Sequence, residues 1–259
     1  MGGPGARGPR SRLDGGARPR RHLRRRLALA ERQPRGVREL SEDGTPARGD
    51  VPLEVFVYYD FASSLSYVAH RVLARIDESL AAERVDLRWK AIDLTGVGNF
   101  QRGRLLDPAR RESLLRVAAA LDVEFDPPAR WPDSRLAGEV AVVLDERIDR
   151  GHDPKLEREW REAAFAAYYE QLDEIEDVLR DFERRAAFPL GAADDLAAGR
   201  RLAEVTRSAV AAGVEGVPTL MLDVFPLCGI HDEETMLGMI QRYARRRRRL
   251  EADAAVGVN

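Results

Sequence analysis

The sequence predicts an α/β fold in which a β-α-β unit is followed by a run of helices and then completed by an α-β-β-α unit. Three observations favour this order. Apolar and polar residues alternate over 53–59 and 85–92, which is typical of strands. Apolar residues between these two runs recur at helical spacing. After Gly213 the pattern returns to short apolar runs, so both ends of the folded part contribute strands to the sheet.

The β-α-β unit predicts a pair of parallel strands. Between the strands at 53–59 and 85–92, a helix over 66–80 places apolar residues such as Val68 and Val72 on one face. Two strands joined by a single helix favour parallel pairing through a right-handed crossover.

Helices make up the middle of the chain, after a polar loop over 95–110. We expect them over 112–121, 134–150, 156–171, 175–187 and 193–212. Gly213 suits the end of the last helix because glycine readily takes the left-handed conformation. Two short strands over 219–223 and 224–228 follow, and Asp232 is expected to cap a final amphipathic helix.

An arginine-rich tail precedes the folded domain, which we expect to cover 51–250. Residues 1–50 hold 13 Arg against six Asp and Glu, a balance of +7, so the remaining residues balance to −9. The tail is rich in Gly and Pro and lacks an apolar period, which predicts disorder. An arm for nucleic acid or another anionic surface, or a transit peptide, are the alternatives. A flexible C-terminal tail is expected over 251–259.

Cysteine use and apolar run length limit the class of protein. Cys228 is the only cysteine, which excludes an intrachain disulfide. A lone cysteine is most often a small buried hydrophobe. No apolar run approaches the ~18–20 residues that span a membrane, and no His, Cys, Asp or Glu cluster has metal-ligand spacing. We therefore expect a cytoplasmic protein with no metal, and neither a membrane nor nucleic acid as partner.

The tetrad Ser63-Ser64-Leu65-Ser66 lies where the first strand gives way to a helix. A helix N-terminus favours an anion by roughly 0.3–1 kcal/mol when exposed, and reactive thiols are often found there. Here hydroxyls stand at the spacing of a C-x-x-C pair. They cannot form a disulfide, but they can donate a hydrogen bond to a bound thiolate. The alternative is that Ser63 and Ser64 only cap the helix.

Two further features belong to the candidate site. Pro218 directly precedes a predicted strand in the run Gly213 to Thr219, which indicates either a tight turn or an ordinary strand entry. His70 follows Ser66 by one helical turn, a spacing that allows a hydrogen bond between the two side chains. No third residue that would orient a Ser-His pair is visible.

Several motifs resemble the DsbA-like thioredoxin family, in the same order along the chain. The run over 56–69, Phe-Val-Tyr-Tyr-Asp-Phe-Ala-Ser-Ser-Leu-Ser-Tyr-Val-Ala, resembles its first-strand motif. The similarity is closest to the branch with 2-hydroxychromene-2-carboxylate isomerase and kappa-class glutathione transferase. Segments 131–137 and 165–169 resemble the helical insert, and 213–222 resembles the Gly-Val-x-Gly-Val-Pro-Thr-Phe signature. The resemblance implies a thioredoxin-like fold with an all-helical insertion over about 108–192.

The resemblance also implies roles for particular residues. In the isomerase and transferase branch the first serine of the motif contacts the glutathione sulfur, which corresponds to Ser63. Ser64 stands where that branch has a proline. The residue before a cis proline binds the cysteinyl backbone, which corresponds to Val217 and Pro218. Where the branch grips the γ-glutamyl end with a Ser-Asp pair, this chain has Ile230-His231. Asn99 is similar in position to an asparagine of the substrate loop.

These observations favour an enzyme that depends on glutathione or another low-molecular-weight thiol. It would be an isomerase or transferase acting on a small electrophilic or aromatic substrate. The expected catalytic residues are Ser63 and Ser66, and the expected thiol-binding residues are Ser63, Ser64, Val217, Pro218 and His231. The alternatives are an oxidoreductase-class member without dithiol activity and a non-catalytic module that binds a peptide or partner. Relatives in the glutathione-using branch are commonly dimeric, which leaves a homodimer open.

Overall fold

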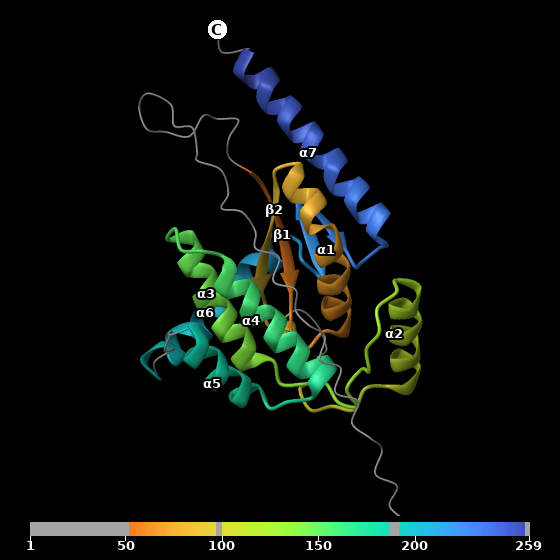
Figure 1. Cartoon of the computed structure of the whole chain (residues 1–259), viewed down its shortest axis with the longest axis vertical. Coiled ribbons are helices and arrows are strands. Elements are labelled where there is room, and N and C mark those ends of the chain that lie inside the picture. The colour runs from red at the N-terminus through yellow and green to blue at the C-terminus, as the bar shows by residue number, and fades with distance from the viewer. Residues whose placement is uncertain (1–51, 97–99, 187–191, 257–259) are drawn as a thin grey trace, which may run out of the picture. The chain divides into compact units, whose positions relative to one another are not determined.

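The computed structural model describes residues 52–96, 100–186 and 192–256 (Figure 1). The tail expected over 1–50 and the residue Asn99 lie outside this part of the chain. Strand β1 (Leu53–Tyr59) pairs in parallel with β2 (Val85–Ala91), as predicted. Helix α1 (Ser64–Ala82) connects them and begins two residues earlier than the apolar spacing indicates.

Two short strands complete a four-stranded sheet in the order β2-β1-β3-β4. Strand β3 (Thr219–Leu222) runs antiparallel to β1, and β4 (Phe225–Cys228) runs antiparallel to β3 at the sheet edge. Pro226 is tolerated in β4 because its nitrogen, which has no hydrogen, lies on the outer side of this edge strand.

Helices fill the interval between the two halves of the sheet. They are the 3-10 turn η1 (Leu94–Gly96), α2 (Pro108–Ala120), α3 (Arg135–Asp149), α4 (Lys155–Ala166), the π-helical turn η2 (Ala167–Gln171), α5 (Ile175–Ala186) and α6 (Ala192–Ala211). Helix α7 (Glu233–Val256) ends the described chain.

Besides the start of α1, three helix boundaries differ clearly from the sequence-based prediction. Helix α2 begins four residues early because Asp107 caps it, accepting the N–H groups of Ala109 and Arg110. The helix expected over 156–171 becomes a π-turn at its end and stops at Leu172, which has a left-handed φ of 56°. Helix α7 continues to Val256, so residues 251–256 are helical, whereas a flexible tail was expected there.

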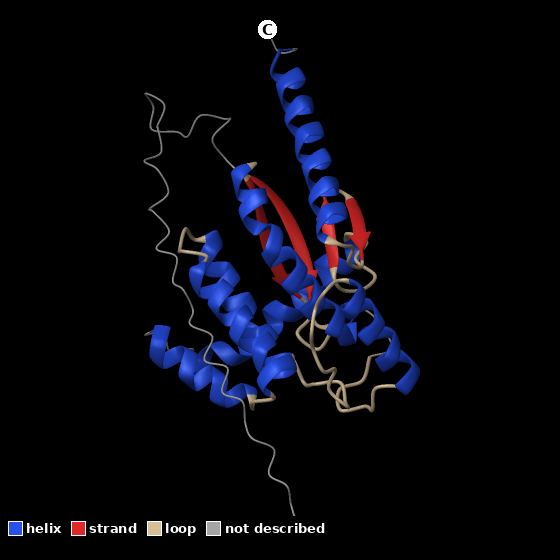
Figure 2. Cartoon of the chain, turned by 45° about the vertical axis from the view of Figure 1, so that its right-hand side comes forward, coloured by secondary structure: helices blue, strands red, loops and turns tan. Residues whose placement is uncertain are grey.

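Helices cover both faces of the sheet (Figure 2). Alternate residues of β1, Val55, Val57 and Tyr59, are fully buried in a core that they share with α1 and α7. The opposite face packs on α6, where Ala209 meets Met221 of β3. Because β1 lies between β2 and β3, its C-terminal end and the start of α1 are held firmly from both sides. None of the described helices combines the length and apolarity that a membrane span requires.

Candidate active site

Ser63 occupies the corner between β1 and α1 and is the N-cap of the helix. Its Oγ accepts a hydrogen bond from the Ser66 N–H at 3.3 Å, so Ser63 caps the helix as the alternative interpretation expects, whereas Ser64 is the first residue of the helix. The same hydroxyl donates to the carbonyl oxygen of Val217 at 3.4 Å, across 154 residues of sequence. Capping and contact with the loop before β3 are therefore both functions of this one hydroxyl, and its side chain is only 6% exposed.

The Val217–Pro218 peptide bond is cis, as the family resemblance implies. Pro218 is buried and its carbonyl oxygen accepts the N–H of Gly229 at 2.8 Å, while Thr219 Oγ1 donates to the Gly216 carbonyl at 2.7 Å. These bonds fix the loop on both sides of the cis peptide. The fold therefore brings the serine tetrad and the proline loop together, and we call the Ser63–Val217 contact the serine corner.

The other two serines of the tetrad lie inside the protein. Ser66 is fully buried and its Oγ accepts the N–H of Asp60 at 3.4 Å, so no part of it faces a ligand. Ser64 is nearly buried and hydrogen-bonds the hydroxyl of Tyr169, which itself donates to the Phe61 carbonyl at 2.9 Å. Ser63 is thus the member of the tetrad best placed to meet a ligand, and we do not carry forward the catalytic role expected for Ser66.

Asp60 joins three segments behind the serine corner. Its carboxylate accepts the N–H of Ala62 at 2.8 Å, the hydroxyl of Ser134 at 2.6 Å and the N–H of Leu94 at 2.5 Å. Its own carbonyl accepts the N–H of Ser63 at 3.0 Å. Asp60 is 2% exposed, and burial raises the pKa of its carboxyl group. Sequence reasoning did not single it out, although an acid between Tyr59 and Phe61 in an apolar run was a usable signal.

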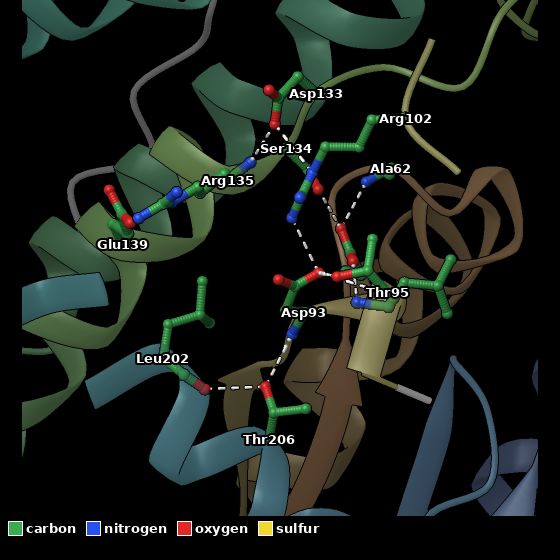
Figure 3. Close-up of polar contacts among 12 residues, drawn as sticks. Ala62, Asp93, Thr95, Arg102, Asp133, Ser134, Arg135, Glu139, Leu202 and Thr206 are labelled. Atoms are coloured by element: carbon green, nitrogen blue, oxygen red, sulfur yellow. Dashed lines mark hydrogen bonds and ion pairs between the residues drawn. The ribbon is translucent and has the colours of Figure 1, made fainter. Parts of the chain in front are cut away.

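A second acid, Asp93, anchors the loop that follows β2. Its carboxylate accepts hydrogen bonds from Thr95 and Arg102, and its N–H donates to Thr206 Oγ1 of α6 at 2.9 Å (Figure 3). Arg102 also lies 3.0 Å from Asp133, just before α3. Burial acts to raise the pKa of Asp93, but the hydrogen bonds prevail and lower it. The network fixes Leu94 relative to α3 and α6.

The two histidines considered from the sequence lie in different environments. His70 is buried, and its Nε2 lies 2.7 Å from Glu162 of α4, while its ring stacks on Phe165. Burial lowers the pKa of His70. This pairing with Glu162 takes the place of a Ser66–His70 pair. His231 is exposed in the turn after Gly229, whose φ is +84°.

Cys228 is exposed, so the expectation that it is a buried hydrophobe is wrong. It ends β4 opposite Thr219, and the edge position of that strand leaves one side uncovered. Within the described residues, no group of three or more His, Cys, Asp or Glu side chains is placed to hold a metal ion.

A surface cavity of about 1060 Å³ lies beside Leu94 and Glu215, and its lining residues include neither Ser63 nor Val217. Leu94, which Asp60 holds, and Glu215, two residues before Val217, both line it. Its other lining groups include Phe100, Arg104 and Trp131. We call it the Trp131 cavity. Its volume is that of a site for a small organic molecule.

Comparisons with known proteins agree with this fold. The family model of the DSBA-like thioredoxin domain matches residues 54–241. No curated protein matches the sequence significantly. Among solved structures, 2-hydroxychromene-2-carboxylate isomerase is 21% identical with a TM-score of 0.57, over 78% of this chain and 99% of that one. A probable DsbA oxidoreductase from Streptomyces coelicolor is 17% identical with a TM-score of 0.50, over 74% and 89% of the two chains. The chain is therefore a member of the DsbA-like thioredoxin family.

Proposed function

We propose that the serine corner binds glutathione or another low-molecular-weight thiol for an isomerase or transferase reaction on a small electrophilic or aromatic substrate. The observation that carries this proposal is the approach of the Ser63 hydroxyl to the Val217 carbonyl beside a cis proline. A hydroxyl at a helix N-terminus is a hydrogen-bond donor in a positive field. Dithiol exchange needs two thiols, and the sequence contains a single cysteine.

The residues at the corner suit a thiol compound in part. Ser63 can donate to a sulfur anion, and its present bond to Val217 is long at 3.4 Å, so another acceptor can compete for the proton. The backbone of Val217 can hold an extended ligand through strand-like hydrogen bonds. At the γ-glutamyl end, this chain has Ile230-His231 in place of the Ser-Asp pair of the glutathione-using branch, and His231 is exposed. This difference favours binding of the cysteinyl part over recognition of the whole tripeptide.

A bound thiol would supply the nucleophilic sulfur for the reaction. Ser63 and the first turn of α1 would favour its ionised form, because a hydrogen bond and a helix N-terminus both stabilise an anion. Asp60 and Asp93 would keep Leu94 and the corner in place while the substrate occupies the Trp131 cavity. The proposal places the reaction in the cytoplasm. It includes a homodimer as the form in which the protein acts.

The second candidate is a non-catalytic module that binds an extended peptide along Val217. The observation that favours it is the burial of Ser66 together with the capping role of Ser63, which is itself only 6% exposed. An oxidoreductase-class member without dithiol activity would show the same geometry. If the protein turns over an electrophilic substrate only when a thiol is added, the first proposal holds. Neither the peptide-binding module nor the oxidoreductase-class member would show this dependence.

The experiment is a thermal-shift titration with millimolar glutathione and cysteine on the wild type and on Ser63→Ala. Ser63→Ala removes an N-cap worth about 1 kcal/mol, so it lowers the melting temperature even without ligand. The readout is therefore the difference in melting temperature with and without the thiol, measured for each variant. Ser113→Ala on the exposed side of α2 is the control. We expect a ligand-induced rise in wild type and control that Ser63→Ala loses. No rise with any thiol, or an equal rise in Ser63→Ala, rejects the proposal.

A further inference from the structure

The Trp131 cavity is lined by three arginines, three acids and two aromatic rings, which the serine corner does not explain. The guanidinium of Arg110 lies over the Trp131 ring at 4.7 Å from its centroid. The Phe100 ring meets Trp131 edge-on at 4.8 Å. An arginine stacked in this way keeps the edge of its guanidinium free for hydrogen bonds in the plane of the group.

Two arginines of the cavity lack a carboxylate partner among the described residues. The Arg104 side chain has neither an ion pair nor a hydrogen bond in that part of the chain, and the only contact of this kind that the Arg110 side chain makes is with Trp131. Arg111, in contrast, is paired with Asp126. The acids that line the cavity are Asp126, the helix cap Asp107 and Glu215. Guanidinium groups without a counter-charge are the donors that bind carboxylates and similar anions in a bidentate manner.

Two exposed leucines also line this cavity. Leu105 is 60% exposed and Leu172 is 69% exposed, so both present apolar surface to this cavity. Leu172 has a φ of 56°, a conformation that a bulky residue rarely adopts and that often accompanies a functional site. Among the described residues, this cavity therefore combines two guanidinium groups that have no ion pair with apolar surface that a ligand could cover.

We propose that the Trp131 cavity binds an organic anion with an apolar body. Arg104 and Arg110 would hold its acid group, and Trp131, Leu105 and Leu172 would contact its carbon framework. The binding site stands on this lining alone. That the anion is the substrate of the thiol reaction rests on the proposed function. The link between the two sites is that Asp60 accepts the N–H of Leu94 and that Glu215 lies two residues before Val217.

The test uses 8-anilinonaphthalene-1-sulfonate and its neutral analogue without the sulfonate as probes. Trp89 and Trp160 are buried and Trp131 is partly exposed, so quenching that Trp131→Phe abolishes reports on this cavity. We expect saturable binding of the sulfonate by the wild type. Arg104→Gln should weaken it at least about tenfold, which corresponds to ~1.4 kcal/mol, because a hydrogen bond to a charged group is lost. Arg116→Gln, an exposed arginine of α2 outside the cavity, is the matched control and should stay within about twofold.

A second variant tests whether weaker binding can arise without a loss of folding. Leu172→Asn suits the left-handed backbone, so it should keep the melting temperature while it weakens both probes. Equal affinity for the neutral analogue, or equal affinity of Arg104→Gln and Arg116→Gln, overturns the proposal. Ser63→Ala should bind the sulfonate as the wild type does. If the cavity binds the probe but no thiol shifts the melting temperature, the proposed function fails and the binding site remains.

Discussion

Replacing Asp60 by alanine should destabilise the fold strongly, although Asp60 contacts no cation among the described residues. Its carboxylate accepts three hydrogen bonds, from Ala62, Leu94 and Ser134, at 2.5 to 2.8 Å. Each bond to a charged acceptor is worth ~1.5–3 kcal/mol. The cost of burying the charge offsets part of that sum, because burial raises the pKa of Asp60. We therefore expect Asp60→Ala to lower the free energy of unfolding by about 3–5 kcal/mol.

Urea denaturation followed by circular dichroism measures this loss, provided that the slope against urea stays constant. Asp107→Ala is the control, since Asp107 is an exposed helix cap and should cost only about 1 kcal/mol. If Asp60→Ala costs no more than Asp107→Ala, Asp60 does not hold the three segments together, and the account of the serine corner is wrong.

The same carboxyl gives a pH dependence whose sign follows from the raised pKa. Between the ordinary value of 3.8 and the raised pKa, folded Asp60 retains a proton that the unfolded chain has released. The folded state then binds more protons, so the contribution of Asp60 to stability falls as the pH rises through this interval. Asp60→Asn cannot ionise. Its cost relative to the wild type should therefore shrink as the pH rises, and a cost that grows with pH contradicts the raised pKa.

Two further predictions concern Tyr59 and Cys228. The Tyr59 hydroxyl is buried with no hydrogen-bond partner among the described residues, so Tyr59→Phe should leave the free energy of unfolding unchanged or raise it by up to about 1 kcal/mol. A loss above about 1 kcal/mol in urea denaturation would show that the hydroxyl has a partner. Cys228 is exposed, so a disulfide reagent should label one thiol in the native protein, and Cys228→Ser should keep the melting temperature. Labelling that needs denaturant contradicts the exposed position.

The alternation of apolar residues was enough to predict the first strand, because both faces of β1 follow a period of two. The start of α2 was placed too late, since the cap Asp107 and the proline after it lie outside the apolar pattern. The π-turn after α4 depends on tertiary bonds. Tyr168 donates to the Asp133 carbonyl and Tyr169 to the Phe61 carbonyl, and no local pattern reveals these distant partners.

In the candidate site, too, some features follow from the local sequence and others depend on tertiary contacts. Ser63 could be identified from its position between a strand and a helix, but its contact with Val217 was expected only through the family resemblance. The exposure of Cys228 follows from the order of strands in the sheet, which places β4 at the edge. Arg104 and Trp131 come together through loops, where charge and spacing carry no periodic signal.

The most direct test of the thiol proposal is the pKa of a bound thiol. The ultraviolet absorbance of the thiolate, titrated against pH for glutathione with a saturating excess of protein, measures it. A charge-assisted hydrogen bond from Ser63 is worth ~1.5–3 kcal/mol, and 1.36 kcal/mol corresponds to about one pH unit. The bound thiol should therefore have a pKa about one to two pH units below that of free glutathione, and Ser63→Ala should remove most of this difference. A bound thiol with the pKa of the free compound, or the same lowered pKa in Ser63→Ala, would contradict the role of the serine corner.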